Sequence, residues 1–285
     1  MKKITQTQQR IGLIQVTTLH SYLTIGLYTF KRVHVQLTGA KQMSDLLHLM
    51  QHPGTNPKSF SSTICSAEVV DGDTWVELSE SFFYPSGGGQ PADHGSLEME
   101  SGLSVILDVQ KGEKLLHNIG SNESDGIKLE SPVIASIDIN RRNVLSRMHT
   151  AQHLISAAAD ELFSGRTIGN QIGLEKTRID IGIEDRSAFD KELLQEVVND
   201  GIDQGIPVTM SQEHRSELTS NPLVRVNLDL LPKNVQELRV ITIEGRDICP
   251  CAGTHVANTK EIGLIKINKV KSKGAGKLRV EYSLL

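Results

Sequence analysis

The chain has 285 residues, of which 38% are hydrophobic and 22% charged, and its formal net charge is −4 at pH 7. A chain of this length is long enough for two ordinary domains, each with a hydrophobic core of its own. No apolar run approaches the ~18 residues that a membrane span needs, and the start of the chain shows no secretory signal pattern, so neither a membrane nor a secreted protein is expected.

The charge is unevenly distributed along the chain. Residues 1–60 contain seven Lys or Arg and one acid, Asp45, a net charge of +6, so the remaining residues carry −10. A body this acidic excludes non-specific nucleic-acid binding, and any polyanion must be met by a local basic patch. The cysteines Cys65, Cys249 and Cys251 are odd in number and indicate no disulfide framework, so the cytoplasm is the expected compartment.

The first part of the chain is the least informative. A strand is indicated at 11–19 and a helix at 41–50, followed by a loop rich in Pro, Gly, Asn and Ser. We treat residues 1–61 as an N-terminal extension whose structure the sequence leaves undefined.

Residues 62–140 have the pattern of short strands joined by tight turns. Asp71-Gly72 separates the strand-like stretches 67–70 and 74–78, and Asp-Gly readily adopts the positive φ angles of a two-residue hairpin turn. Further strands are expected at 95–99, 103–109, 114–119 and 132–139. Closely spaced strands of this kind favour a small N-terminal β-barrel.

A glycine-rich loop, Ser86-Gly87-Gly88-Gly89-Gln90-Pro91, lies within this region. Consecutive glycines cost backbone entropy, but they let a ligand or another part of the backbone come close. The loop therefore predicts either a pocket wall that presents Gln90 or a flexible turn between strands. A phosphate cradle is not favoured, because no Lys follows and no helix begins there.

Two pairs of side chains with the same spacing indicate a metal site. In His149-Thr150-Ala151-Gln152-His153, within the helix-like stretch 142–163, a four-residue step places both imidazoles on one helix face. Cys251-Ala252-Gly253-Thr254-His255 repeats the step in a Gly-containing loop after a strand-like stretch. Packed or solvent-facing histidines are the alternative for the helix pair alone. Taken together, the four side chains form the His₃Cys set that zinc prefers, and one Zn²⁺ per chain is expected.

The remainder, residues 141–285, alternates helix-like and strand-like stretches. Ser187 and Asp190 resemble a capping box that starts a helix over 188–200. With strands at 177–182, 207–212 and 237–243, the pattern predicts an α+β fold in which an α/β two-layer sandwich follows the barrel. Near the end of the chain, six basic residues and no acid lie between Ile262 and Val280. The basic stretch indicates either phosphate contacts, through Lys271, Lys273, Lys277 and Arg279, or a strand edge guarded by lysines.

The motifs His-x-x-x-His, Cys-x-Gly-Thr-His and Ser-Gly-Gly-Gly-Gln-Pro together resemble those of the alanyl-tRNA editing family, free-standing deacylases similar to the editing domain of alanyl-tRNA synthetase. The resemblance runs from about Ser66 to the C-terminus, and Ala252 departs from it where the family usually has a second Gly. It implies a β-barrel at 62–140 followed by a zinc-containing tRNA editing domain at 141–285. It also implies zinc ligation by His149, His153, Cys251 and His255, and substrate binding by Gln90, Thr254, Gly88 and Gly89.

The function implied by the resemblance is hydrolysis, in trans and without ATP, of the ester that joins a wrong amino acid to the acceptor end of tRNA(Ala). Serine is the expected amino acid, with glycine as a second. Alternatives are editing of another mischarged tRNA, such as Ser-tRNA(Thr), an unrelated zinc esterase, or a non-catalytic zinc-containing tRNA-binding module. The N-terminal extension has three possible interpretations: a targeting segment, an arm that contacts tRNA, or a segment without a role in the chemistry.

Four protein ligands make a closed site, which is usually structural, whereas hydrolytic zinc keeps a position open. Two roles for zinc are open. It takes part directly in hydrolysis, after gaining a fifth coordination position or releasing one protein ligand, or it only shapes the substrate pocket.

Overall fold

The structure, a computed structural model, describes residues 3–11, 14–25, 28–38, 45–121, 126–231, 233–274 and 276–285, with the backbone alone for residues before 47. The chain divides into two compact units. Unit 1 contains Met1–Met50, Pro57–Ser86 and Ala92–Asp138, and unit 2 contains Gln51–Asn56, Gly87–Pro91 and Ile139–Leu285. Gln90 and its glycines therefore belong to the same unit as the predicted metal ligands.

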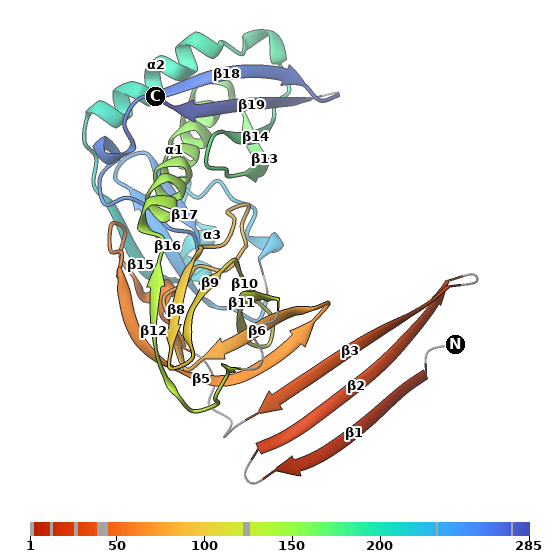
Figure 1. Ribbon diagram of the computed structural model, residues 1–285. Helices are drawn as coiled ribbons and strands as arrows, with labels where there is room; N and C mark the ends of the chain where they lie inside the picture. The colour runs from red at the N-terminus through yellow and green to blue at the C-terminus, as the bar shows by residue number, and fades with distance from the viewer. Residues whose placement is uncertain are drawn as a thin grey trace. The chain divides into compact units, whose positions relative to one another are not determined.

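Unit 1 is built mainly of antiparallel strands, among which the long, curved β5 stands out in Figure 1. Its elements are β1 (Lys3–Ile11), β2 (Ile14–Ile25), β3 (Tyr28–Thr38), β4 (Asp45–Leu46), the 3₁₀ turn η1 (Leu47–Met50), β5 (Ser59–Val70), β6 (Asp73–Leu78), β7 (Glu80–Ser81), β8 (Gly95–Met99), β9 (Gly102–Ile106), β10 (Asp108–Lys111), β11 (Leu115–Ser121) and β12 (Pro132–Ile137).

The predicted hairpin in this unit is confirmed, but the closed barrel is not. Asp71 and Gly72 have φ angles of 53° and 93° between the paired residues Val70 and Asp73. The first half of β5 pairs with β12, and the second half pairs with β3 and β6. Among the described strands, the sheet ends at β1, at β9 and at β10, and no ladder joins any two of these ends. Tight turns predict pairing between neighbours, whereas closure needs pairing between distant strands, which local sequence does not encode.

The N-terminal extension differs from its local predictions. Two strands replace the single strand expected at 11–19: β1 ends at Ile11, and β2 begins at Ile14. Of the helix expected at 41–50, residues 41–44 lie outside the described residues. The helix prediction is wrong for the rest, because Asp45–Leu46 pairs with β7 as a short strand and Leu47–Met50 forms the 3₁₀ turn. The strands β1, β2 and β3 continue the sheet from β5.

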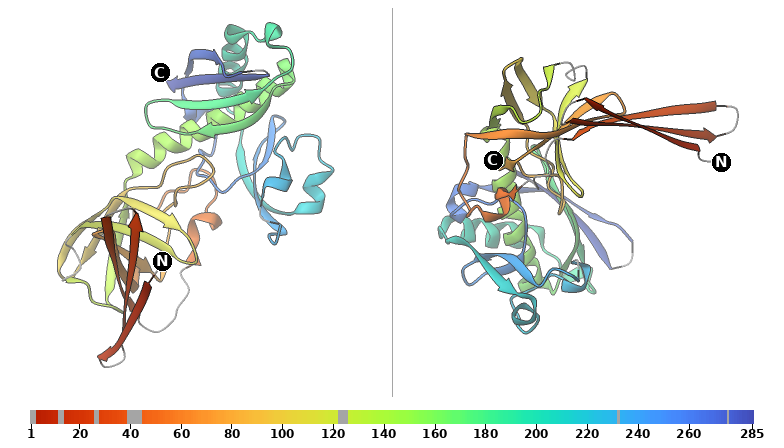
Figure 2. Two further views of the ribbon diagram at one scale, coloured as in Figure 1. Left: turned by 90° about the vertical axis from the view of Figure 1, so that its right-hand side faces the viewer. Right: turned by 90° about the horizontal axis from the view of Figure 1, so that it is seen from below.

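Unit 2 combines helices with antiparallel sheets, as the α+β prediction required (Figure 2). The described strands form sheets of order β13-β14-β19-β18 and β15-β16-β17. Its elements are α1 (Ile139–Phe163), β13 (Arg166–Gln171), β14 (Thr177–Gly182), η3 (Arg186–Ala188), α2 (Lys191–Asp203), β15 (Val208–His214), α3 (Arg215–Thr219), η4 (Leu228–Leu230), β16 (Glu237–Ile243), β17 (Asp247–Pro250), η5 (Thr259–Ile262), β18 (Ile265–Ser272) and β19 (Lys277–Leu284).

Helix α1 is buried on more than one side. Leu145, Met148 and Ile155 enter a core shared with Ile179 of β14 and Val280 of β19, while both imidazoles of the helix are also buried. The helix is therefore a central support rather than an amphipathic surface helix. In the described part of the chain, no helix combines the length and apolarity needed to cross a membrane.

The second helix begins later than predicted. Helix α2 starts at Lys191 with Asp190 as its N-cap, whereas the sequence suggested a start at Ala188 with Ser187 as the cap. Ser187 instead lies in the 3₁₀ turn η3, which is capped by Asp185.

Candidate metal centre

The structure brings together the four side chains that the sequence singled out as metal ligands. His149 and His153 come from consecutive turns of α1, and Cys251 and His255 from the loop after β17. One ligand atom from each lies within 4.8 Å of the others. The Cys251 Sγ is 3.6 Å from His149 Nε2 and 3.4 Å from His255 Nε2, and all three imidazoles are buried.

Each imidazole is held by a hydrogen bond at its Nδ1 atom. The Nδ1 of His149 lies 2.7 Å from Gln90 Oε1, and that of His153 lies 2.9 Å from Asp247 Oδ2. The Nδ1 of His255 lies 3.1 Å from the Thr150 hydroxyl, which itself donates to the Ser146 carbonyl. Amide and carboxylate oxygens only accept, and the Thr150 proton is already used, so all three Nδ1 atoms donate. The Nε2 lone pairs remain for a metal, as in metal sites whose histidines are oriented by such partners.

The charges of the four groups also suit a cation. Burial raises the pKa of the Cys251 thiol, but the neighbouring His149 and His255 outweigh burial and bring it well below its usual value. Burial lowers the pKa of His153, yet hydrogen bonds to Asp247 and Cys251 raise it to about 10. Burial and the neighbouring His149 hold the pKa of His255 at about 3. A bound cation would replace the proton on His153, and the Cys251 thiolate together with imidazole nitrogens is then the donor set of a zinc or similar borderline-soft ion.

Gly253 makes the approach of the loop to α1 feasible. A Cβ at this position would lie 2.2 Å from His149 Cε1 and 2.3 Å from its Nδ1. Any side chain there would displace the imidazole or the loop. The Gly of the Cys-x-Gly-Thr-His motif is therefore needed for packing against a ligand. Ala252, by contrast, is exposed.

The structure places Gln90 behind the metal group. The side chain is buried, and besides His149 it contacts Thr254, whose hydroxyl lies 3.0 Å from Gln90 Nε2. The Thr254 backbone N–H also donates to Gln90 Oε1. Gln90 thus joins a helix ligand to the ligand loop. Thr254 is half-buried, and its hydroxyl also accepts from Ser146.

The glycines before Gln90 serve a close approach between protein segments. Gly88 and Gly89 are exposed and have φ angles of 55° and 85°. A Cβ on Gly89 would lie 1.7 Å from Asn170 Oδ1, and the Gly89 carbonyl accepts from the Ile172 N–H. The loop is fixed against the end of β13 and the residue that follows it.

The four basic candidates lie on one hairpin, formed by β18 and β19. Lys271, Lys273 and Lys277 are exposed. Arg279 differs, because its guanidinium forms two hydrogen bonds with the Asp180 carboxylate, of 2.6 and 2.7 Å, and this pairing lowers the pKa of Asp180. The lysines are the more available partners for a polyanion.

Sequence reasoning missed several residues of the site. Asp247 and Thr150 contact the Nδ1 atoms of His153 and His255, and the Arg239 guanidinium donates to the carbonyls of Cys251 and Gly253 at 2.7 and 3.0 Å. The position of Thr150 beside a ligand and the acid four residues before Cys251 were weak signals. Arg239 had no sequence signal, because its contacts depend on the pairing of β16 with β17 and with the residues that follow β17.

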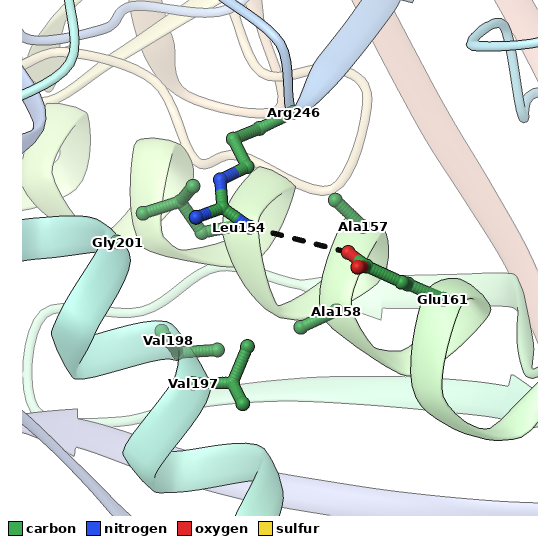
Figure 3. A pocket seen from close by; sticks show the side chains of 8 residues that line it. All are labelled: Leu154, Ala157, Ala158, Glu161, Val197, Val198, Gly201 and Arg246. Carbon is green, nitrogen blue, oxygen red and sulfur yellow. Dashed lines mark ion pairs between the residues drawn. The ribbon is translucent and has the colours of Figure 1, made fainter.

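A shallow pocket between α1 and α2 is separate from the four ligands (Figure 3). Apolar side chains such as Leu154 and Val198 line it, and Arg246 points across it toward Glu161. Its volume of about 10 Å³ leaves room for roughly one water molecule. This pocket is too small for a substrate.

Comparisons with known proteins agree with the geometry. The family model described as "Threonyl and Alanyl tRNA synthetase second additional domain" matches residues 238–281, which include Cys251 and His255. The alanyl-tRNA editing protein AlaX-M of Methanosarcina barkeri is 37% identical over 239 residues, covering 80% of this chain and 95% of the relative. This chain belongs to the alanyl-tRNA editing proteins of the AlaX-M type.

Further relatives show how this alanyl-tRNA editing protein is related to larger enzymes. The AlaX-M protein of Saccharolobus solfataricus is 34% identical over 213 residues, with 74% of this chain and 89% of the relative covered. The alanine–tRNA ligase of Methanopyrus kandleri is 33% identical over 217 residues, which are 73% of this chain but 23% of the ligase. The similarity therefore corresponds to one part of the ligase.

Proposed function

We propose that this alanyl-tRNA editing protein is a trans-editing deacylase that hydrolyses the ester between a wrong amino acid and the acceptor end of tRNA(Ala). The observation that carries the proposal is the oriented His₃Cys group in a chain of the AlaX-M type. We expect serine to be the main amino acid removed and glycine a second, in the cytoplasm and without ATP.

The metal that the proposal assigns to the four ligands is a single Zn²⁺. Three imidazoles with Nδ1 atoms hydrogen-bonded outward and one low-pKa thiol fit the nitrogen and sulfur preference of zinc. When bound, zinc would supply a positive charge able to polarise a substrate carbonyl or to fix the pocket around it.

The substrate would be read by polar groups beside the metal ligands. The Thr254 hydroxyl accepts from Ser146 and Gln90 at 2.8 and 3.0 Å, so we assign its own proton to a substrate oxygen. A donor that is shielded from water by the bound substrate and pairs with a seryl hydroxyl is left unpaired by alanine, which can discriminate by up to roughly 10⁴-fold. Gln90 is assigned to holding His149 and Thr254 in place, and Gly88 and Gly89 to supporting Gln90.

The tRNA would be contacted through the hairpin of β18 and β19. Lys271, Lys273 and Lys277 supply exposed positive charge in an otherwise acidic body. Arg279 would act by holding Asp180 and so limiting its repulsion of phosphate. The editing domain predicted at 141–285 would then include the segments Gly87–Pro91 and Gln51–Asn56 of unit 2.

Deacylation of defined substrates tests the function directly. Purified protein with measured zinc content is incubated without ATP with Ser-tRNA(Ala), Gly-tRNA(Ala), Ala-tRNA(Ala) and Ser-tRNA(Thr). We expect rapid hydrolysis of Ser-tRNA(Ala), slower hydrolysis of Gly-tRNA(Ala) and survival of the other two. Preferential hydrolysis of Ser-tRNA(Thr) would assign the protein to another tRNA, and binding without hydrolysis would indicate a non-catalytic module.

The role of the metal is tested with His153→Ala, with His214→Ala as the control, because His214 is exposed and outside the group. We expect His153→Ala to lose zinc and deacylation together, while His214→Ala keeps both. Activity that survives the loss of zinc would exclude a direct role for the metal.

A further inference from the structure

A chain of ion pairs extends from the His153 ligand into the protein. Asp247 is buried and divides its two oxygens between two partners. Its Oδ2 lies 2.9 Å from His153 Nδ1, and its Oδ1 lies 2.8 Å from an Nη atom of Arg225. Arg225 in turn lies 2.9 Å, through its Nε, from Asp160 Oδ2. Asp160, on the same helix as His153, also pairs with the largely exposed Arg166.

Arg225 is held in position by its surroundings. Its guanidinium also donates to the Arg246 carbonyl at 2.9 Å, and its side chain is only 16% exposed. The preceding residue, Val224, forms a β-bridge with Ile248, next to Asp247. The backbone beside Arg225 therefore follows β17, and its guanidinium is directed at the carboxylate from a fixed point.

The buried carboxylate needs such a partner. An ionised Asp that is removed from water and faces one imidazole N–H keeps a large desolvation cost, which a second, cationic partner offsets. If the guanidinium is lost, Asp247 must turn toward water or move, and each response disturbs the hydrogen bond that orients His153. Loss of the carboxylate that orients a ligating histidine typically weakens metal binding 10–100-fold, and the position of this carboxylate depends on Arg225.

A second metal site is the competing explanation for this cluster. His153, Asp247 and Cys249 also lie close enough together to hold an ion. The Arg225 guanidinium lies 2.8 Å from Asp247 and already neutralises its carboxylate. Its positive charge would also repel a metal ion bound to the same carboxylate. The geometry favours an ion pair over a second cation.

We infer that Arg225 is a positioning residue of the metal centre: by fixing Asp247, it holds His153 in the orientation that binds the metal. Asp160 completes the arrangement by facing the other side of the guanidinium. This inference rests on the proposed metal site, and it assigns a role in that site to the stretch between α3 and η4.

The test compares Arg225→Gln and Arg225→Lys with a matched control, Arg246→Gln. The Arg246 side chain pairs with Glu161 and Gln204, and Figure 3 shows it pointing across the pocket toward Glu161. Its contact with Arg225 is through the backbone, which the substitution keeps. Zinc affinity is measured by competition with a chelator, and the Co²⁺-substituted proteins are compared by visible absorption.

We expect Arg225→Gln to bind zinc 10–100-fold more weakly and to show an altered Co²⁺ spectrum. Arg225→Lys should recover part of the affinity, because an ammonium keeps the charge but not the two-sided contact. Arg246→Gln should match the wild type. Circular dichroism and thermal melting establish whether each variant is folded. If Arg225→Gln is not folded, the comparison is made with Arg225→Lys.

The role of Arg225 would be overturned if folded Arg225→Gln bound zinc with wild-type affinity and gave an unchanged Co²⁺ spectrum. If Arg225→Gln does not fold, the same result for Arg225→Lys would overturn it. Either outcome would leave the metal site intact. Absence of metal binding by the wild type would instead overturn the site itself, and with it this inference.

Discussion

Gly253 lies against His149, and the contact depends on the absence of a side chain. The ring atoms of His149 occupy the space of a Gly253 Cβ, whereas the adjacent Ala252 is exposed. The loop contributes Cys251 and His255 to the metal group. A shift of the loop by the width of a methyl group would therefore change the distances between the four candidate ligand atoms. Ala252, the departure from the family pattern, lies where a methyl group is tolerated.

Gly253→Ala is expected to weaken zinc binding at least tenfold, and the overpacking should reduce the free energy of unfolding by about 1–3 kcal/mol. Ala252→Gly is the matched control and should change zinc binding little. Zinc competition and chemical denaturation of both variants measure the difference. Equal affinity in both variants would contradict the assigned role of Gly253.

At the scale of single elements, the N-cap residue and the core contacts of the apolar face determine where helix α2 begins. The Asp190 carboxylate accepts from the Leu193 N–H at 2.9 Å and so caps α2. Ser187 is in a separate 3₁₀ turn, where its N–H donates to Asp185. Both positions carry residues typical of N-caps, so local sequence did not distinguish them. The helix begins where its apolar face, including Leu194 and Val198, reaches the core.

Asp190→Ala should destabilise the protein by about 1 kcal/mol, because one helical N–H loses its acceptor. Ser187→Ala should change stability far less, because this residue does not cap α2. Urea denaturation of both variants tests the assignment. A larger effect at Ser187 would restore the capping box predicted from sequence.

His117 on β11 makes unit 1 sensitive to acid. Its Nδ1 donates to the Val76 carbonyl, and its Nε2 accepts from the Ser81 hydroxyl at 2.8 Å. The imidazole is fully buried, and burial lowers its pKa from 6.5 to about 4. The folded state thus binds this proton less readily than the unfolded state. The stability that depends on neutral His117 is complete above pH 6.5 and is lost as the pH falls toward 4.

We expect this one residue to reduce the free energy of unfolding by up to about 3 kcal/mol between pH 6.5 and pH 4. His117→Asn should show a shallower dependence on pH over the same range, whatever its stability at neutral pH. Denaturation curves at several pH values give the two slopes. Parallel slopes would show that His117 is not the group responsible.

At the scale of the whole molecule, the candidate metal centre brings together parts of the chain that are far apart in sequence. About a hundred residues separate the helix pair from the loop pair. Gln90 of the glycine-rich loop reaches both, through His149 and Thr254. A bound ion would cross-link α1 to the loop after β17, so metal binding and the stability of unit 2 should be coupled.

A chelator should therefore lower the stability of the wild-type protein. At free zinc 100-fold above its dissociation constant, binding adds about 2.7 kcal/mol, which is lost on chelation. His153→Ala should melt at the same temperature with or without chelator. Thermal melting of both proteins tests the coupling, and a chelator effect of equal size in the variant would rule out this site as its origin.

The amino-acid sequence determined which four side chains form the candidate metal group, the hairpin at Asp71-Gly72 and the α+β character of the chain. These depend on local spacing: a four-residue step aligns side chains on a helix, and Asp-Gly adopts a tight turn. Motif resemblance also indicated the family to which the comparisons assign the chain.

Only the tertiary structure decided which residues support that site. Gln90 is predicted from sequence as a substrate contact, and the structure adds a hydrogen bond between its amide oxygen and His149. Arg225 has no local signal and Asp247 only a weak one, because their contacts depend on β17 lying beside α1 and the stretch after α3. Hydrogen bonds and ion pairs between distant segments are set by how the elements pack, and packing is a property of the whole chain.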